Sequence, residues 1–324
     1  LLCLGAALYI GGLLMALSSP HAGWEGEHVD VVLEPGLDAG SMLGRLHRAG
    51  VVRHPASLRL WLHWSGGSED LQAGEYRFAE PATPLQVLER LRRGEVLLHS
   101  VTIPEGLALD EIAARVAEAG FGSPERLLES FRDPRLVHDL DPAATDLEGY
   151  LFPDTYSFPR GASEERVTAA MVKRFREVTG PGYAEAAEAA GLDLRGAVTL
   201  ASLIEKETSL PEERGRISRV FHNRLRRGML LQCDPTVIYA LKRDGLEVQR
   251  LTYEQLEHDS PWNTYVSPGL PPGPIASPGA ASLEAAVHPA EGEELYFVAS
   301  PEGGHRFSSD LESHSRAVRE WRNY

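Results

Sequence analysis

Apolar residues in the C-terminal half of the chain recur at the spacing of helices. Helices are predicted over residues 163–179, 183–190, 195–208 and 211–227. In the third of these, apolar side chains cover most of the surface: Leu194, Ala197, Val198, Leu200, Ala201, Leu203 and Ile204. Glu205 shares one face with Ala201 and Ile204. It is therefore predicted to be largely buried.

A carboxylate in such a helix has a chemical consequence. Burial disfavours the charged form, so the side chain of Glu205 is prepared to donate a proton near neutral pH. That is the property of a general acid. The alternative is a partly exposed Glu205 that pairs with a Lys or Arg and has only a structural role.

The first half of the chain contains an internal repeat. The segment 32–37 is echoed by 102–107, and each copy predicts a short strand, a Gly turn and a helix that ends at Gly. The residues between the copies predict a helix or strand over 57–64, a strand over 73–78, a helix over 84–93 and a strand over 96–103. These patterns indicate small α+β modules. They are either functional modules or spacers that hold the rest of the chain away from a membrane.

From about Asp141 the character of the sequence changes. Aromatic residues are dense over 147–156, and Asp234 is predicted to be the N-cap of a helix with Pro235 at its first position. The loop 260–275 is rich in Pro and too apolar for a solvated linker, which favours the wall of a binding groove over a loop that merely packs on the core. A short helix over 282–287, strands over 295–299 and 304–307, and a helix over 311–322 are predicted to follow.

The N-terminal segment is apolar and uncharged. Leu1 to Leu17 can span a bilayer as a helix, and this length is also close to that of a signal-peptide core. We expect the segment to remain as a membrane anchor rather than to be cleaved. With either an anchor or a signal peptide, the residues that follow are expected to be translocated across the membrane.

Composition limits the class of protein. The 324 residues contain 43% hydrophobic residues and carry a net charge of −15, which fits two or three globular domains and argues against a nucleic-acid binder. The two cysteines, Cys3 and Cys233, lie far apart and are not expected to form a disulfide bond.

The sequence lacks the motifs of several reactions. It contains no Gly-x-Ser-x-Gly elbow, His-Glu-x-x-His helix or phosphate loop, and its C-terminal histidines lack the spacing of metal ligands. What remains is one buried acid among aromatic, amide and proline-rich segments that suit a carbohydrate groove. Hydrolytic glycosidases use a second carboxylate. A lytic reaction on a muramic acid residue does not need one, because the 6-hydroxyl of the sugar attacks the anomeric carbon.

Five blocks of the C-terminal half carry a resemblance to a known family. They are Glu-Gly-Tyr-Leu-Phe-Pro-Asp-Thr-Tyr at 148–156, Ala-Ser-Leu-Ile-Glu-Lys-Glu-Thr at 201–208, the segment 221–239 around Leu-Gln-Cys-Asp-Pro-Thr, Ser-Pro-Trp-Asn-Thr-Tyr at 260–265 and Gly-Leu-Pro-Pro-Gly-Pro-Ile at 269–275. With these blocks the chain resembles the endolytic murein transglycosylase (YceG-like) family over essentially its whole length. Cys233 is a departure, since Thr is more common there in the family.

The resemblance implies a fold, a location and partners. The fold is α+β, with a transmembrane helix at 1–22, a small α+β module at 23–97, a LysM-like module at 98–140 and a mainly helical catalytic domain with a few strands at 141–324. The protein would be a single-pass inner-membrane protein with its catalytic domain outside the cytoplasm. Its partners would be peptidoglycan glycan strands and peptidoglycan synthases (penicillin-binding proteins), with no cofactor, metal or nucleic acid.

The resemblance also implies a reaction and a site. Glu205 would protonate the oxygen that joins N-acetylmuramic acid to N-acetylglucosamine in nascent strands. It would then accept the proton of the muramic 6-hydroxyl as a 1,6-anhydro ring closes, and such cuts would limit strand elongation. The candidates for contacts with the glycan, or for charges that tune Glu205, are Gln232, Asp234, Asn263, Tyr265, Glu148 and Glu207.

Two alternative functions remain open. A hydrolytic muramidase would use Glu205 as the acid and Asp234 or Glu148 as the second carboxylate, and it would leave a reducing end instead of an anhydro end. A noncatalytic scaffold would bind glycan and synthases without using the carboxylate of Glu205.

Overall fold

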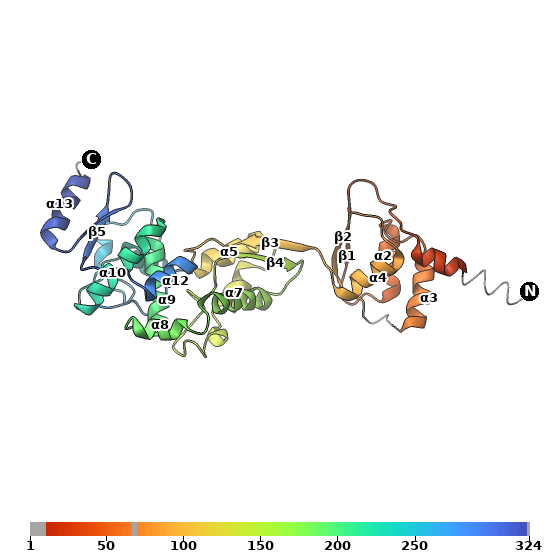
Figure 1. The fold of residues 1–324 in the computed structure, drawn as a ribbon, viewed down its shortest axis with the longest axis horizontal. Coiled ribbons are helices and arrows are strands. Elements are labelled where there is room, and N and C mark those ends of the chain that lie inside the picture. The colour runs from red at the N-terminus through yellow and green to blue at the C-terminus, as the bar shows by residue number, and fades with distance from the viewer. Residues whose placement is uncertain (1–10, 67–69, 323–324) are drawn as a thin grey trace, which may run out of the picture. The chain divides into compact units, whose positions relative to one another are not determined.

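The chain forms two compact units in a computed structural model, which describes residues 11–66 and 70–322 (Figure 1). Unit 1 comprises Leu1–Ser100 and Ser157–Gly161, and unit 2 comprises Val101–Tyr156 and Ala162–Tyr324. Helices and two-stranded sheets occur in the described part of the chain. The α+β class expected from the sequence is therefore confirmed, whereas the division into four parts stays a prediction.

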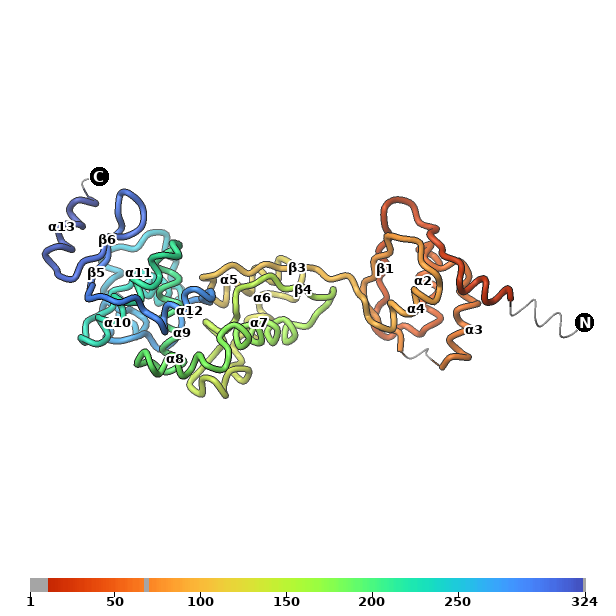
Figure 2. Tube along the Cα trace, in the orientation of Figure 1, coloured from red at the N-terminus to blue at the C-terminus, as the bar shows by residue number. Residues whose placement is uncertain are grey.

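Within its described residues, unit 1 contains an antiparallel pair of strands and several helices (Figure 2). Its elements are β1 (Val29–Leu33), α2 (Ala39–Arg48), α3 (Pro55–Ser65), β2 (Gly74–Phe78) and α4 (Pro84–Arg93). Val31 and Leu33 of β1 are buried and alternate with more exposed residues, as expected for a strand with one face in a core. Helices α2, α3 and α4 supply apolar side chains to that core, which also contains Leu17.

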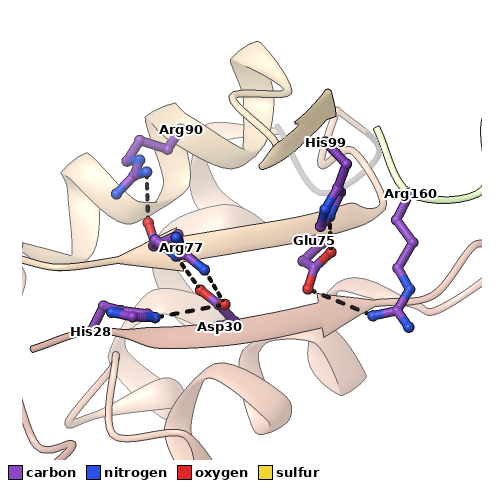
Figure 3. Close-up of polar contacts among 7 residues, drawn as sticks. All are labelled: His28, Asp30, Glu75, Arg77, Arg90, His99 and Arg160. Carbon is purple, nitrogen blue, oxygen red and sulfur yellow. Dashed lines mark hydrogen bonds and ion pairs between the residues drawn. The ribbon is translucent and has the colours of Figure 1, made fainter. Parts of the chain in front are cut away.

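Charged side chains tie the strands of unit 1 together (Figure 3). Asp30 and Arg77 are partners in the β1–β2 register, and Arg77 Nη2 lies 2.6 Å from Asp30 Oδ2. The carboxylate of Glu75 is buried and contacts His99 Nε2 at 2.7 Å and Arg160 Nη1 at 3.7 Å. Two residues that lie far apart in the sequence, both after β2, thus meet at one carboxylate.

The N-terminal segment is described only in part. Residues 11–18 are helical. Over the described ranges, no helix has the length and apolar character needed to cross a membrane. Residues 1–10 of the predicted anchor lie outside the described residues.

The repeat expected from the sequence has a structural counterpart. In the first copy, β1 pairs with β2, and α2 and α3 lie between them in the chain. In the second copy, β3 pairs with β4, and two helices again intervene. The bounds of the second copy are β3 (Leu98–Thr102), α5 (Leu109–Glu118), α6 (Pro124–Phe131) and β4 (Thr155–Pro159).

The larger part of unit 2 is a group of helices around α9 (Leu194–Glu207). Its other helices are α7 (Glu164–Thr179), α8 (Tyr183–Ala189), α10 (Arg214–Arg226), α11 (Asp234–Arg243) and α12 (Ala280–Val287). Helix α9 packs against α8, α10, α11 and α12, and each of its residues from Ala197 to Ile204 is buried. The helix predicted over 211–227 begins as a 3-10 turn, Pro211–Glu213, and continues as α10.

The C-terminal elements form a hairpin and a helix. They are β5 (Tyr296–Ala299), β6 (His305–Ser308) and α13 (Leu311–Arg322), with short 3-10 turns elsewhere at Pro134–Leu136 and Gln255–Glu257. Strands β5 and β6 pair in antiparallel fashion, and both contact α13. The strand pair and final helix expected from the sequence are confirmed.

Candidate active site

Helix α9 carries two carboxylates in its last turn. Glu205 and Glu207 are two residues apart, so their side chains point to different sides of the helix. The helix ends because Thr208 adopts extended backbone angles, and Leu210 N donates a hydrogen bond to Thr208 Oγ1 at 3.0 Å. The two carboxylates therefore have different neighbours.

Glu205 lies against helices α10 and α12. Its Oε2 accepts a hydrogen bond from Gly279 N at 3.0 Å, and its Oε1 lies 3.6 Å from Arg214 Nη2. The side chain of Glu205 is 7% exposed, so its expected burial is confirmed. Because Gly279 is the N-cap of α12, the charge of Glu205 also stabilises the start of that helix. The ion pair with Arg214 is the contact that the structural alternative expected, although the side chain of Glu205 is buried rather than partly exposed.

Glu205 and Arg214 have a third charged neighbour, Glu105, which was not predicted from the sequence. Arg214 Nη2 lies 3.9 Å from Glu105 Oε2, in the loop before α5. Burial and the negative charge of Glu205 raise the pKa of Glu105, against the effect of Arg214. A Cβ on Gly279 would lie 1.8 Å from Glu105 Oε1, so a side chain added there would displace the carboxylate of Glu105. The available signal was Pro104-Glu105-Gly106 in the second copy of the repeat.

Glu207 lies at the wall of a cavity of about 510 Å³. Residues from the end of α9, from α10, from the start of α11, from the proline-rich loop 260–275 and from the C-terminal hairpin line this cavity. Its lining includes Arg224, Leu231, Gln232, Asp234, Tyr265, Phe297 and His305. Three of the predicted glycan contacts thus meet at Glu207, and Glu205 is not part of this lining.

The surroundings of Glu207 tune its proton affinity. Burial raises the pKa of Glu207 to about 7, and the negative charge of Asp234 contributes to the increase. A hydrogen bond with Cys233 and the positive charges of His305 and Arg224 oppose it. Near neutral pH the carboxyl group is therefore present in both protonation states. That suits a group which first donates and then accepts a proton.

Gln232 has an unusual backbone conformation beside Glu207. Its φ of 49° is positive, and no other residue except glycine has this feature in the described ranges. Gln232 N donates to Thr264 O at 3.1 Å, and Arg224 Nη1 donates to Leu231 O at 2.9 Å and lies 3.5 Å from Gln232 Oε1. A positive φ is strained for a residue with a side chain, and it persists only where the surrounding structure enforces it. The position of Gln232 is therefore fixed by its neighbours.

Asp234 and Tyr265 form a pair at the same cavity. Tyr265 Oη donates a hydrogen bond to Asp234 Oδ1 at 2.5 Å. Burial raises the pKa of Tyr265, and this hydrogen bond raises it further. The prediction that Asp234 is an N-cap was wrong: Cys233 is the N-cap of α11, and Asp234 is the first helical residue. Its carboxylate is therefore free to hold Tyr265.

Asn263 does not have the exposure of a glycan contact. It is fully buried, and its Nδ2 donates to Leu256 O at 2.9 Å and to His258 O at 2.8 Å. Its Oδ1 accepts from Tyr265 N at 2.9 Å. The sequence indicated a polar side chain in a rigid loop but not its direction. In the structure, Asn263 shapes the loop and thereby places Tyr265.

Substitutions in this loop are expected to separate stability from activity. Asn263→Ala leaves buried carbonyl and amide groups without partners and is expected to cost about 1–3 kcal/mol of folding stability. Tyr265→Phe keeps the ring and is expected to leave the melting temperature within a few degrees while weakening cleavage. Thermal unfolding and a glycan-cleavage assay measure both effects. An unchanged melting temperature for Asn263→Ala would contradict its structural role.

Glu148 lines a different cavity from Glu207. Tyr239 lines the same cavity as Glu148. Burial raises the pKa of Glu148 to about 8, against the hydrogen bonds from Leu109 N and Tyr239 Oη. The expected role of Glu148 in tuning the catalytic acid stays a prediction.

A histidine at the Glu207 cavity was not among the predicted site residues. His305 Nδ1 lies 2.6 Å from Glu213 Oε2, and His305 N donates to Glu213 Oε1 at 2.7 Å. Burial acts to raise the pKa of Glu213, but the hydrogen bonds from His305 outweigh it and lower the pKa. The sequence signal was the segment His305-Arg306-Phe307-Ser308. Within the described ranges, no cluster of three or more His, Cys, Asp or Glu side chains could hold a metal ion.

Comparison with known proteins shows to which family the chain belongs. The model of the YceG-like family matches residues 31–320. The chain belongs to the YceG-like family. A crystal structure of a yceG-like protein from Listeria monocytogenes superposes with a TM-score of 0.60 at 32% identity, covering 90% of this chain and 99% of that one. The family expected from the sequence blocks is therefore confirmed.

Relatives in this family have names that state an activity. An endolytic murein transglycosylase of Bacillus subtilis (strain 168) is 32% identical over 305 residues, which cover 89% of this chain and 83% of that protein. An endolytic murein transglycosylase of Streptococcus pneumoniae (strain D39) is 30% identical over 323 residues. The match spans 91% of this chain and 58% of the length of that streptococcal protein.

Proposed function

We propose that this chain is an endolytic lytic transglycosylase that cleaves the glycan strands of peptidoglycan, with Glu207 as its acid and base. The family match and the names of the relatives support the reaction. The observation that carries the site is the cavity in which Glu207, with a pKa of about 7, meets Gln232, Asp234 and Tyr265. Glu205 instead pairs with Arg214 and Gly279.

In the proposed reaction, one carboxyl group acts twice. Protonated Glu207 donates its proton to the oxygen between N-acetylmuramic acid and N-acetylglucosamine, and the bond from that oxygen to the muramic C1 breaks. The resulting carboxylate accepts the proton of the muramic 6-hydroxyl while its oxygen bonds to C1 and closes the 1,6-anhydro ring. Proton and electron counts balance without water. Gln232 and the Asp234–Tyr265 pair would orient the sugar at this carboxyl group.

The length of the products tests the endolytic function. Purified protein is incubated with long glycan strands, and the fragments are separated by size early in the reaction. Internal cuts are expected to give a broad range of fragment lengths. Release of disaccharides alone from strand ends would contradict an endolytic reaction, and intact strands would contradict cleavage altogether.

The pH dependence of cleavage is expected to follow Glu207. The acid form is required for the first step, and it is depleted as pH rises through the pKa of about 7. We therefore expect kcat/KM to fall about tenfold per pH unit above this value. Asp234→Asn removes a negative charge that raises this pKa, so the fall should begin at lower pH. A profile that stays flat from pH 6 to 9 would refute Glu207 as the acid.

We propose further that residues 1–17 anchor the protein in the inner membrane and that the modules after the anchor are LysM-like. The uncharged N-terminal sequence supports the anchor, and the recurring strand–helix–helix–strand order supports repeated modules. An anchored enzyme outside the cytoplasm would meet nascent strands beside the penicillin-binding proteins that make them.

Cell fractionation checks the anchor. The full-length protein is expected in the membrane fraction, and a variant that starts at Gly23 is expected in the soluble fraction with its cleavage activity retained. Mature protein found in the soluble fraction with a new N-terminus after Ser18 or Ala22 would show that the segment is a signal peptide.

A further inference from the structure

The Glu148 cavity is separate from the proposed active site. Its volume is about 620 Å³, and it shares no lining residue with the Glu207 cavity. It lies within unit 2, between the start of α5, the loop before Gly149 and the last turn of α11. The proposed reaction uses none of these residues.

Glu148 is an incompletely bonded acid at the wall of this cavity. Its residue exposure is 5%. Oε2 accepts hydrogen bonds from Leu109 N at 3.3 Å and Tyr239 Oη at 3.2 Å, whereas the buried Oε1 has no partner. With its pKa near 8, the group is mainly protonated at neutral pH, and the proton belongs on Oε1 because Oε2 already accepts two bonds. A buried hydroxyl without an acceptor is costly, so an incoming acceptor would be stabilised there.

Two arginines line the same cavity without an ion pair among the described residues. Arg132 and Arg243 line it, and in the described part of the chain neither forms an ion pair with a carboxylate. The third cation, Lys242, is paired with Glu111 at 3.2 Å. Guanidinium groups match the planar geometry of a carboxylate. Asp110 and Asp146 also line the cavity, and their carboxylates would bind an amino group of the same ligand.

We propose that this cavity binds a carboxylate of a peptide, through Arg132, Arg243 and the acid of Glu148. The identity of that peptide rests on the proposed function. The glycan strands of peptidoglycan carry short peptides with free carboxylate and amino groups, and we expect one of these to be the ligand. The cavity would then bind the short peptide (the stem) attached to a strand whose sugars lie at Glu207. Strands with stems would bind more tightly than bare glycan.

Direct titration tests the site without using activity. A synthetic stem peptide with free carboxylates is titrated into the full chain, next to the same peptide with its carboxylates amidated. We expect the amidated peptide, and separately the Arg132→Gln/Arg243→Gln variant, to bind at least tenfold more weakly. Arg135→Gln is the matched control, since Arg135 pairs with Asp133 outside the cavity. Equal affinity of the double variant and the wild type, or no binding by the wild type, would overturn the proposal.

A pH series adds a second readout that a structural role of Glu148 would not give. The groups that face Glu148 are Asp110 of α5, Asp146 of its own loop and Tyr239 of α11, with the three cations beyond them. Ionisation above pH 8 replaces a donor by a charge that repels the ligand, so affinity should fall between pH 7 and 9. Glu148→Gln keeps a donor and should show a smaller fall, because only the amino group of the peptide then titrates in this range. A fall of equal size in Glu148→Gln would contradict the role of Glu148.

The two proposals can fail independently. If the wild type binds the peptide but cuts no strand, the proposed function is wrong and this site stands. If it cuts bare and peptide-bearing strands with equal KM and does not bind the peptide, the function stands and this site is wrong.

Discussion

Glu207→Gln is expected to reduce the rate of glycan cleavage by about 10²- to 10⁴-fold, the range typical of general acid–base catalysis. The amide cannot supply the proton to the leaving sugar or remove one from the 6-hydroxyl. Initial rates on purified strands measure the loss. Retention of more than a tenth of the wild-type rate would contradict the assignment of Glu207.

Thermal unfolding controls for the fold of this variant. The pKa of Glu207 is raised in the folded protein from its usual 4.5 to about 7, so ionisation costs stability as pH rises between these values. Below this window, where the group is protonated in both states, no such cost exists. The amide removes the cost, so Glu207→Gln should melt no lower than the wild type at pH 8. A large fall in melting temperature would mean that lost activity reflects unfolding.

Arg214→Met is expected to lower the folding stability by about 3–5 kcal/mol, because it leaves a buried carboxylate without its partner. The side chains of Arg214 and Glu205 are 9% and 7% exposed, so water cannot replace the lost ion pair. Arg214 also donates to Ser282 Oγ at 3.1 Å. Chemical denaturation of wild type and variant measures the difference.

A double variant separates the charge effect from lost packing. Glu205→Gln in the Arg214→Met background removes the unpaired charge and should restore part of the stability. Arg227→Met, at an exposed position just after α10, is the matched control and should change stability little. If the double variant is less stable than Arg214→Met alone, the ion pair does not explain the loss.

Much of the fold could be predicted from the spacing of apolar residues. Helix α9 was expected within one residue of its bounds because a long apolar pattern is a strong local signal, and the structure shows that Asp193 caps its start. The C-terminal strand pair was predicted from a local pattern as well, and the repeat in the first half from the similarity of the segments 32–37 and 102–107. Local patterns of this kind depend on neighbours in the sequence.

The choice between Glu205 and Glu207 could not be predicted in this way. Helix α9 is buried on nearly all sides, so a shared face with apolar residues does not mark the side that carries the chemistry. The neighbours that distinguish the two carboxylates come from far away in the chain: Arg214 and Gly279 for Glu205, Asp234 and His305 for Glu207. Only the packing of α9 against α10, α11 and α12 brings them together.

The most direct test of the account is mass spectrometry of the fragments that wild type, Glu205→Gln and Glu207→Gln produce from the same strands. We predict fragments that end in 1,6-anhydro-N-acetylmuramic acid, one water lighter than hydrolysis products, from the wild type. Folded Glu205→Gln should still give them, and Glu207→Gln should give none. Reducing ends from the wild type would indicate hydrolysis, with Asp234, which also lines the cavity, as the candidate second carboxylate. Anhydro ends from Glu207→Gln, together with their loss in a folded Glu205→Gln, would contradict the central claim.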